Sequence, residues 1–153
     1  MNNEALSSQI TPAAIAAARE YLSSARRISA MISLRLAQLD RLRDQGERVT
    51  RALGGPLGGS GAGDRVGDAA ASLADAEEEL LADYRRLTET ETAIRSLLST
   101  RPDARHRTVM EMRYLEGMPF FRIAMAMNYD ERQIYRFHQR GLERVALMLS
   151  LDK

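Results

Sequence analysis

Residues 118–142 read MPFFRIAMAMNYDERQIYRFHQRGL, and this stretch decides the fold that we expect. A short apolar segment ends at Met127, and Asn128 follows it where the chain must turn. Asparagine tolerates the left-handed backbone conformation better than most residues. Asp130 can then cap a second helix, and Gln133, three residues on, completes a capping box. The stretch therefore predicts a short helix, a tight turn and a longer helix.

The spacing of two apolar residues favours a close crossing of these helices. Ala124 lies in the first helix, and the branched Ile134 comes ten positions later in the second. Two helices approach closely only where one presents a small side chain, and a branched apolar residue then fixes the crossing. Together with the turn and the capping box, this spacing predicts a helix-turn-helix whose second helix continues to about Leu149.

A further helix is expected just upstream. Asp103 can cap a helix that runs from Ala104 to Leu115, and Gly117 can close it. Pro102 ends the helix before it, because proline disfavours a helical conformation in the preceding residue. We therefore expect a helix-turn-helix domain at residues 103–150. Methionine fills irregular gaps in cores, and the methionines expected there are Met110, Met112, Met125, Met127 and Met148.

The first hundred residues carry two heptad patterns. Thr11 can cap a helix with Pro12 at its first position, and this helix should extend to Leu53. Apolar or small residues recur along it at alternating spacings of three and four, the pattern of a coiled-coil seam. The seam residues are Ile15, Ala18, Leu22, Ala25, Ser29, Ile32, Leu36 and Leu39.

A second heptad helix should begin near Asp68. Its seam residues are Leu73, Glu77, Leu80, Tyr84, Leu87, Glu91, Ile94 and Leu98. Residues 54–67 are rich in glycine but lack the Gly-Lys-Ser/Thr ending of a phosphate-binding loop, so we expect a flexible linker. Residues 11–100 thus form a helical hairpin or a coiled coil. The stripes pair either within one chain or between two chains of a dimer, and both arrangements fit the pattern.

Composition excludes several classes of protein. The chain has no cysteine, which removes disulfides, thiolate zinc sites and cysteine nucleophiles. We find no signal peptide and no run near the ~18 apolar residues of a membrane span, so we expect a cytoplasmic protein without membrane contact. The two histidines lack metalloprotease spacing, and Glu77, Glu78 and Glu79 point in different directions on a helix. We therefore expect no catalytic activity, metal site or cofactor.

The net charge of the chain does not indicate nucleic-acid binding, but the type of its basic residues bears on it. Net charge is +1, and every basic residue except Lys153 is arginine. Arginine presents a planar fork that suits phosphate groups and guanine edges. An arginine-biased genome is the simpler explanation of this usage.

At this point the sequence resembles a known family, because three segments are similar to region 4 of bacterial sigma factors. These segments are Arg113–Gly117, the short helix around Ile123–Ala124, and Ile134–Val145. The family has apolar residues at the positions of Phe137, Leu142 and Val145 and a small residue at that of Gly141, and this chain fills all four compatibly. The resemblance covers about a third of the chain. The whole arrangement is more similar to small phage and prophage regulators, including the ArpU-type late regulators.

The resemblance implies that the first two turns of the second helix read bases. Carried over one position at a time, the reading positions fall on Glu131, Arg132 and Arg136, with Tyr135 beside them. The two arginines lie four residues apart, so both can enter one major groove, where arginine contacts guanine. Arg140, one turn further on, is expected to meet phosphate. A solvated helix face is the alternative explanation of these arginines.

The residue types differ from those of housekeeping sigma factors, which have a basic residue followed by an acidic one where this chain has Glu131 and Arg132. We therefore expect another target sequence. The function implied is that of a phage or prophage transcriptional regulator that binds double-stranded DNA. A protein-interaction module and a phage DNA-packaging adaptor remain alternatives. RNA polymerase is a further implied partner, because region 4 of sigma factors docks on polymerase as well as on DNA.

Overall fold

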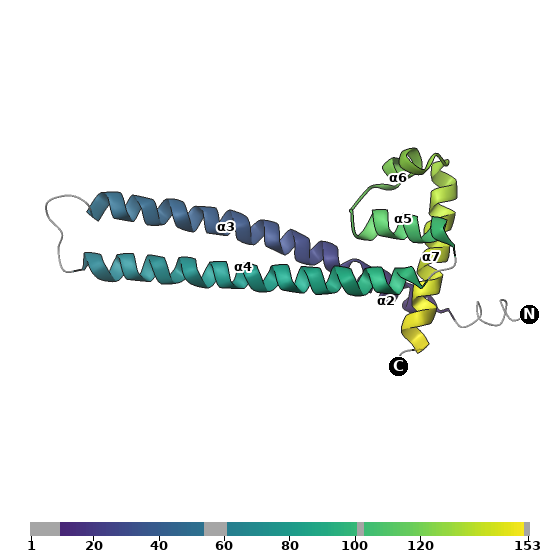
Figure 1. Cartoon of the computed structure of the whole chain (residues 1–153), viewed down its shortest axis with the longest axis horizontal. Coiled ribbons are helices and arrows are strands. Elements are labelled where there is room, and N and C mark those ends of the chain that lie inside the picture. The colour runs from purple at the N-terminus through teal and green to yellow at the C-terminus, as the bar shows by residue number, and fades with distance from the viewer. Residues whose placement is uncertain (1–9, 54–60, 101–102, 152–153) are drawn as a thin grey trace, which may run out of the picture. The chain divides into compact units, whose positions relative to one another are not determined.

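The computed structural model describes residues 10–53, 61–100 and 103–151, and these residues form helices and no strand. The all-α fold class is therefore confirmed. The helices, labelled in Figure 1, are α2 (Pro12–Leu22), α3 (Ser24–Leu53), α4 (Ala62–Ser99), α5 (Ala104–Tyr114), α6 (Phe120–Met127) and α7 (Glu131–Leu151). Within the described part of the chain, no helix is long and apolar enough to cross a membrane.

The chain divides into two compact units. The hairpin unit is Ile28–Thr88, and the terminal unit comprises the described residues of Met1–Arg27 and Glu89–Lys153. This grouping differs from the expected boundary near residue 100, because α2 packs against α7 rather than belonging to the hairpin. The terminal unit thus combines segments from both ends of the sequence.

The predicted helix starts are confirmed at two caps. The Thr11 hydroxyl accepts a hydrogen bond from the backbone N–H of Ala14 at 3.1 Å, with proline at the first helical position. The Asp103 carboxylate accepts one from the backbone N–H of Arg105 at 2.9 Å. The predicted continuous helix to Leu53 is interrupted, since α2 ends at Leu22 and α3 begins two residues later.

In the hairpin unit, α3 and α4 run side by side in opposite directions (Figure 1). The two heptad helices pair within one chain. Arg35 forms ion pairs with Asp83 and Glu79, and Arg43 pairs with Glu77 at 3.3 Å. These contacts fix which residues of the two helices face one another.

The heptad seams were predicted correctly at their terminal-unit ends and only in part in the hairpin, where Ile32 and Leu39 are buried as predicted. In α3, the predicted seam residue Leu36 lies two heptads after Leu22 and is 39% exposed. Its neighbour Arg35 lies in the seam instead, where it pairs with Asp83. In α4, Leu98 is buried but Tyr84 is 44% exposed, and Asp83 takes the buried position at 5%. An α-helix drifts by ~20° per heptad relative to a strict seven-residue repeat. Over two heptads this drift is only ~40°, against ~100° between successive residues, so it does not by itself explain why Asp83 is buried in place of Tyr84. Glu77, another predicted seam residue, is exposed.

The predicted linker at residues 54–67 is only partly testable. Residues 54–60 lie outside the described residues, but α4 begins at Ala62, so the linker prediction is wrong for residues 62–67. Asp64 lies in the first turn of this helix, where a negative charge interacts favourably with the helix dipole.

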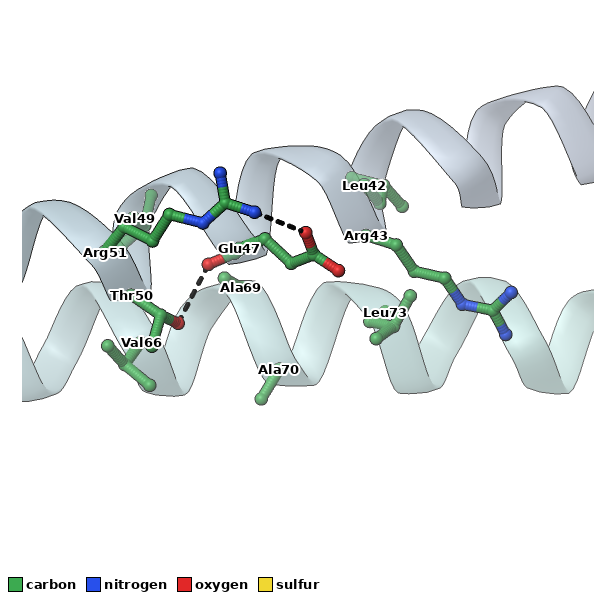
Figure 2. A pocket seen from close by; sticks show the side chains of 11 residues that line it. Leu42, Arg43, Glu47, Val49, Thr50, Arg51, Val66, Ala69, Ala70 and Leu73 are labelled. Carbon is green, nitrogen blue, oxygen red and sulfur yellow. Dashed lines mark hydrogen bonds and ion pairs between the residues drawn. The ribbon is translucent and has the colours of Figure 1, made fainter.

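A cavity of about 670 Å³ lies between α3 and α4 near this end of the hairpin (Figure 2). Small residues open it, because Gly46, Ala69 and Ala70 leave space between the helices. The charged groups there are partnered, since Arg51 pairs with Glu47 at 3.2 Å. We read this cavity as loose packing of the two helices.

Candidate nucleic-acid interface

A compact apolar core holds α5, α6 and α7 together. The cluster comprises Val109, Ile123, Ala124, Ile134 and Phe137, each at most 7% exposed. Ala124 and Ile134, the residues predicted to meet where the second helix crosses the first, thus share one core. Met110 is also fully buried, whereas Met125 is 78% exposed, so its predicted place in the core is wrong. The small Gly141 lies against Met110, because a Cβ there would lie 2.5 Å from its sulfur.

The segment between α6 and α7 has the local features that the sequence predicts. Asn128 ends α6 in the left-handed conformation, with φ 56° and ψ 45°. The backbone N–H of Gln133 donates to the Asp130 carboxylate at 2.7 Å, which is the Asp130 half of the predicted capping box. The turn before α6 also contains a left-handed residue, Gly117, with φ 69°. These turns set the direction in which α7 leaves the core.

All the predicted DNA-contacting residues lie on the surface of α7. Those residues are Glu131, Arg132, Tyr135, Arg136 and Arg140, and all are exposed. None of the three arginines has an ion pair within the described parts of the chain. The exposed face of α7 therefore presents unneutralised cations over two successive turns.

Three of these residues, Arg132, Tyr135 and Arg136, line one cavity. Glu131 and Arg140 are not part of its lining. The cavity measures about 620 Å³, and we call it the arginine cavity. Its other cations are Arg19 of α2 and Arg113 of α5. Four arginines thus line one space, and among the described residues no Asp or Glu contributes to its lining.

Two of the lining residues form a buried hydrogen bond that sequence reasoning missed. The Tyr114 hydroxyl lies 2.9 Å from Nε2 of His138, and the two residues are 6% and 8% exposed. Nothing in the sequence pattern identified His138 as the partner of Tyr114. The Phe120 ring meets His138 edge-on, with centroids 4.9 Å apart.

The environment of this pair favours neutral side chains. Burial, together with the positive charges of Arg19 and Arg113, lowers the pKa of His138 to about 4. Burial raises the pKa of Tyr114, against the opposing effect of the same two arginines. Both groups are therefore uncharged near neutral pH, and the net charge of the cavity lining comes from its arginines.

Arg113 is held in a fixed position at the edge of the cavity. Its guanidinium donates to the backbone carbonyl of Met118 at 3.1 Å and stacks over the Phe120 ring, 4.4 Å from the centroid. Arg19 reaches the cavity from α2, a helix that the heptad pattern assigned to another domain. Its sequence context carries no signal of this role, because only the packing of α2 on α7 places it there.

Across the described residues, no group of three or more His, Cys, Asp or Glu side chains could hold a metal ion.

Comparisons with protein-family models, with curated proteins and with solved structures give no match to this chain.

Proposed function

We propose that the chain is a sequence-specific transcriptional regulator that binds double-stranded DNA through α7. The observation that carries the proposal is the row of exposed, unpaired arginines on the first turns of this helix, Arg132, Arg136 and Arg140. An α-helix fits the DNA major groove, where the arginine fork can contact guanine O6 and N7 together. The cap at Asp130 and the left-handed Asn128 support it, since they define the turn after α6 and the start of α7.

Within this proposal the arginines have different roles. Arg132 and Arg136 lie near the start of α7 and contact base edges, as the resemblance to sigma region 4 implies. Arg140 lies one turn further on and contacts backbone phosphate. Glu131 and Tyr135 flank the two base-reading arginines, and Tyr135 is 49% exposed, with its ring 4.5 Å from that of Phe120.

The test begins with selection of preferred sites from a random duplex pool by the full chain. Affinities for the selected site and for a random duplex are then measured over a series of salt concentrations. Arg136→Ala should lose about 1–3 kcal/mol on the selected site and much less on random DNA. The matched control is Arg144→Ala, an exposed arginine two turns further along α7, which should weaken both duplexes by a similar, smaller amount.

Two results would contradict the proposal. A selection that enriches no sequence removes the specific reading, and equal losses on both duplexes for Arg136→Ala show that the arginine supplies charge rather than base recognition. In either case the exposed face of α7 is a nonspecific or protein-directed surface.

A protein-binding function is the second candidate, and it has an observation of its own. Phe121 and Met125 lie four residues apart on α6 and are 55% and 78% exposed. Residues at this spacing share one helix face, and large apolar side chains exposed together are typical of contact surfaces. Phe121→Ser with Met125→Ser should abolish co-purification of RNA polymerase while leaving DNA affinity intact. Polymerase retained equally by this variant and by the parent chain excludes this face as the contact.

A further inference from the structure

The lining of the arginine cavity carries four positive charges and no carboxylate among the described residues. Arg19, Arg113, Arg132 and Arg136 come from three different helices and line one space. Like charges repel, and the described residues place no carboxylate in the lining to offset them. A cavity of this kind is electrostatically complementary to an anion.

The arrangement of the four groups also suits a particular anion. Arg113 is already oriented by the Met118 carbonyl and the Phe120 ring, so little freedom is lost when it binds. Arg132 and Arg136 form no ion pair within the described residues, so their donors are available. Planar guanidinium groups bind phosphate oxygens in pairs of parallel hydrogen bonds, and several of them can share the oxygens of one phosphate.

We propose that the arginine cavity is a phosphate-binding site in which Arg19 of α2 and Arg113 of α5 hold a phosphate group beside Arg132 and Arg136 of α7. The aromatic rings of Phe120 and Tyr135 line the same space and cover the group that carries the phosphate. That phosphate belongs either to the backbone of a nucleic acid or to a small phosphorylated compound. The proposed site depends on the proposed DNA-binding function only if the phosphate belongs to a nucleic acid.

If the phosphate belongs to the DNA backbone, α2 is part of the DNA-binding surface. Arg19 then contacts the backbone next to the bases that α7 reads, although it lies more than a hundred residues earlier in the chain. A contact of this kind adds affinity without sequence preference, because backbone phosphates are the same at every site.

The first arm of the test uses inorganic phosphate and the full chain. Phosphate is titrated against sodium chloride of equal ionic strength, and the NMR signals of the His138 ring and the Arg113 Nε–H are followed. We expect saturable shifts of both signals with phosphate and none with chloride. Arg19→Gln should weaken phosphate binding by roughly tenfold or more, the loss typical of a charge-assisted hydrogen bond. The control Arg85→Gln removes an exposed arginine of the hairpin unit and should leave the affinity unchanged.

The second arm measures duplex binding by the same variants. A parallel loss of duplex affinity in Arg19→Gln supports the site and identifies its source as the DNA backbone. A loss of phosphate affinity with unchanged duplex affinity supports the site and assigns it to a small phosphorylated compound. If the parent chain binds phosphate here but no duplex, the site stands and the proposed DNA function fails.

The phosphate site is overturned if phosphate shifts the His138 and Arg113 signals no more than chloride does. It is equally overturned if Arg19→Gln and Arg85→Gln bind phosphate alike, because the cations would then act only through overall charge. Both results are independent of whether α7 reads DNA.

Discussion

His138 should make the stability of the terminal unit depend on pH, and one substitution should remove that dependence. The imidazole is 8% exposed and shares a hydrogen bond with the Tyr114 hydroxyl. Burial lowers its pKa to about 4, assisted by the charges of Arg19 and Arg113. A histidine in the unfolded chain titrates near 6.5. At a pH between these two values, His138 is neutral in the folded chain and protonated in the unfolded chain.

The sign and size of the effect follow from this difference. Between pH ~4 and ~6.5 the unfolded chain binds more protons at this site, so stability is full above ~6.5 and falls as the pH drops toward 4. A shift from the ordinary value to about 4 corresponds to a loss on the order of 3 kcal/mol, at ~1.4 kcal/mol per pKa unit. Asp103 does not interfere, because its hydrogen bond with Arg105 lowers its pKa to about 2 and its contribution is lost only below this window.

The assay is urea denaturation of the full chain at a series of pH values across this window. His138→Gln keeps a hydrogen-bonding partner for Tyr114 but cannot titrate, so its free energy of unfolding should be nearly independent of pH there. The reasoning is refuted if His138→Gln shows the same slope as the parent, or if the NMR titration of His138 has its midpoint near 6.5.

Two further predictions concern packing. Gly141→Ala should destabilise the chain by about 1–3 kcal/mol, because its Cβ would lie 2.5 Å from the sulfur of the fully buried Met110. Gly46→Ala is the matched control, with nothing within 4 Å, and should stabilise by about 0.5–1 kcal/mol in a urea melt. Asp83→Leu should lower the melting temperature because it removes the buried carboxylate that pairs with Arg35 and leaves only the exposed Glu79, and adding Arg35→Leu should restore it. A double variant no more stable than Asp83→Leu would show that the ion pair is not the cause.

Local signals in the sequence were sufficient for several helix starts and one turn of the terminal unit, although the end of α2 at Leu22 was not predicted. Thr11, Asp103 and Asp130 all act as predicted caps, and Asn128 adopts the predicted left-handed conformation. Such features depend on a residue and its immediate neighbours in the chain. They can therefore be predicted without knowing what packs against the helix.

The seam residues and the arginine cavity needed information that is not local. Arg35 and Asp83 occupy seam positions that an apolar pattern assigns to neighbouring residues, and only their mutual pairing makes this arrangement acceptable. Met125 was expected in the core for its apolar character, yet the face of α6 that carries it has no partner helix among the described residues. Arg19 could not be assigned to a site because its cavity is formed by residues nearly a hundred positions away or more.

The boundary of the heptad region illustrates why periodicity alone misplaces a domain. Ala18, Ala25, Ile32 and Leu39 are each seven residues apart, and all are at most 5% exposed. One position of the repeat therefore reports burial correctly along the whole stretch, whereas the other includes the exposed Leu36. The repeat does not report the partner, which is α7 for the helix that carries Ala18, whereas Ile32 and Leu39 lie in the hairpin unit. The chain leaves the terminal unit after Arg27 and returns at Glu89, so in sequence the hairpin is an insertion between α2 and the helices that α2 packs with. A seven-residue repeat that continues through an insertion point does not show where the insertion begins. The repeat residues stay buried on both sides of that point, and only the helices that bury them change.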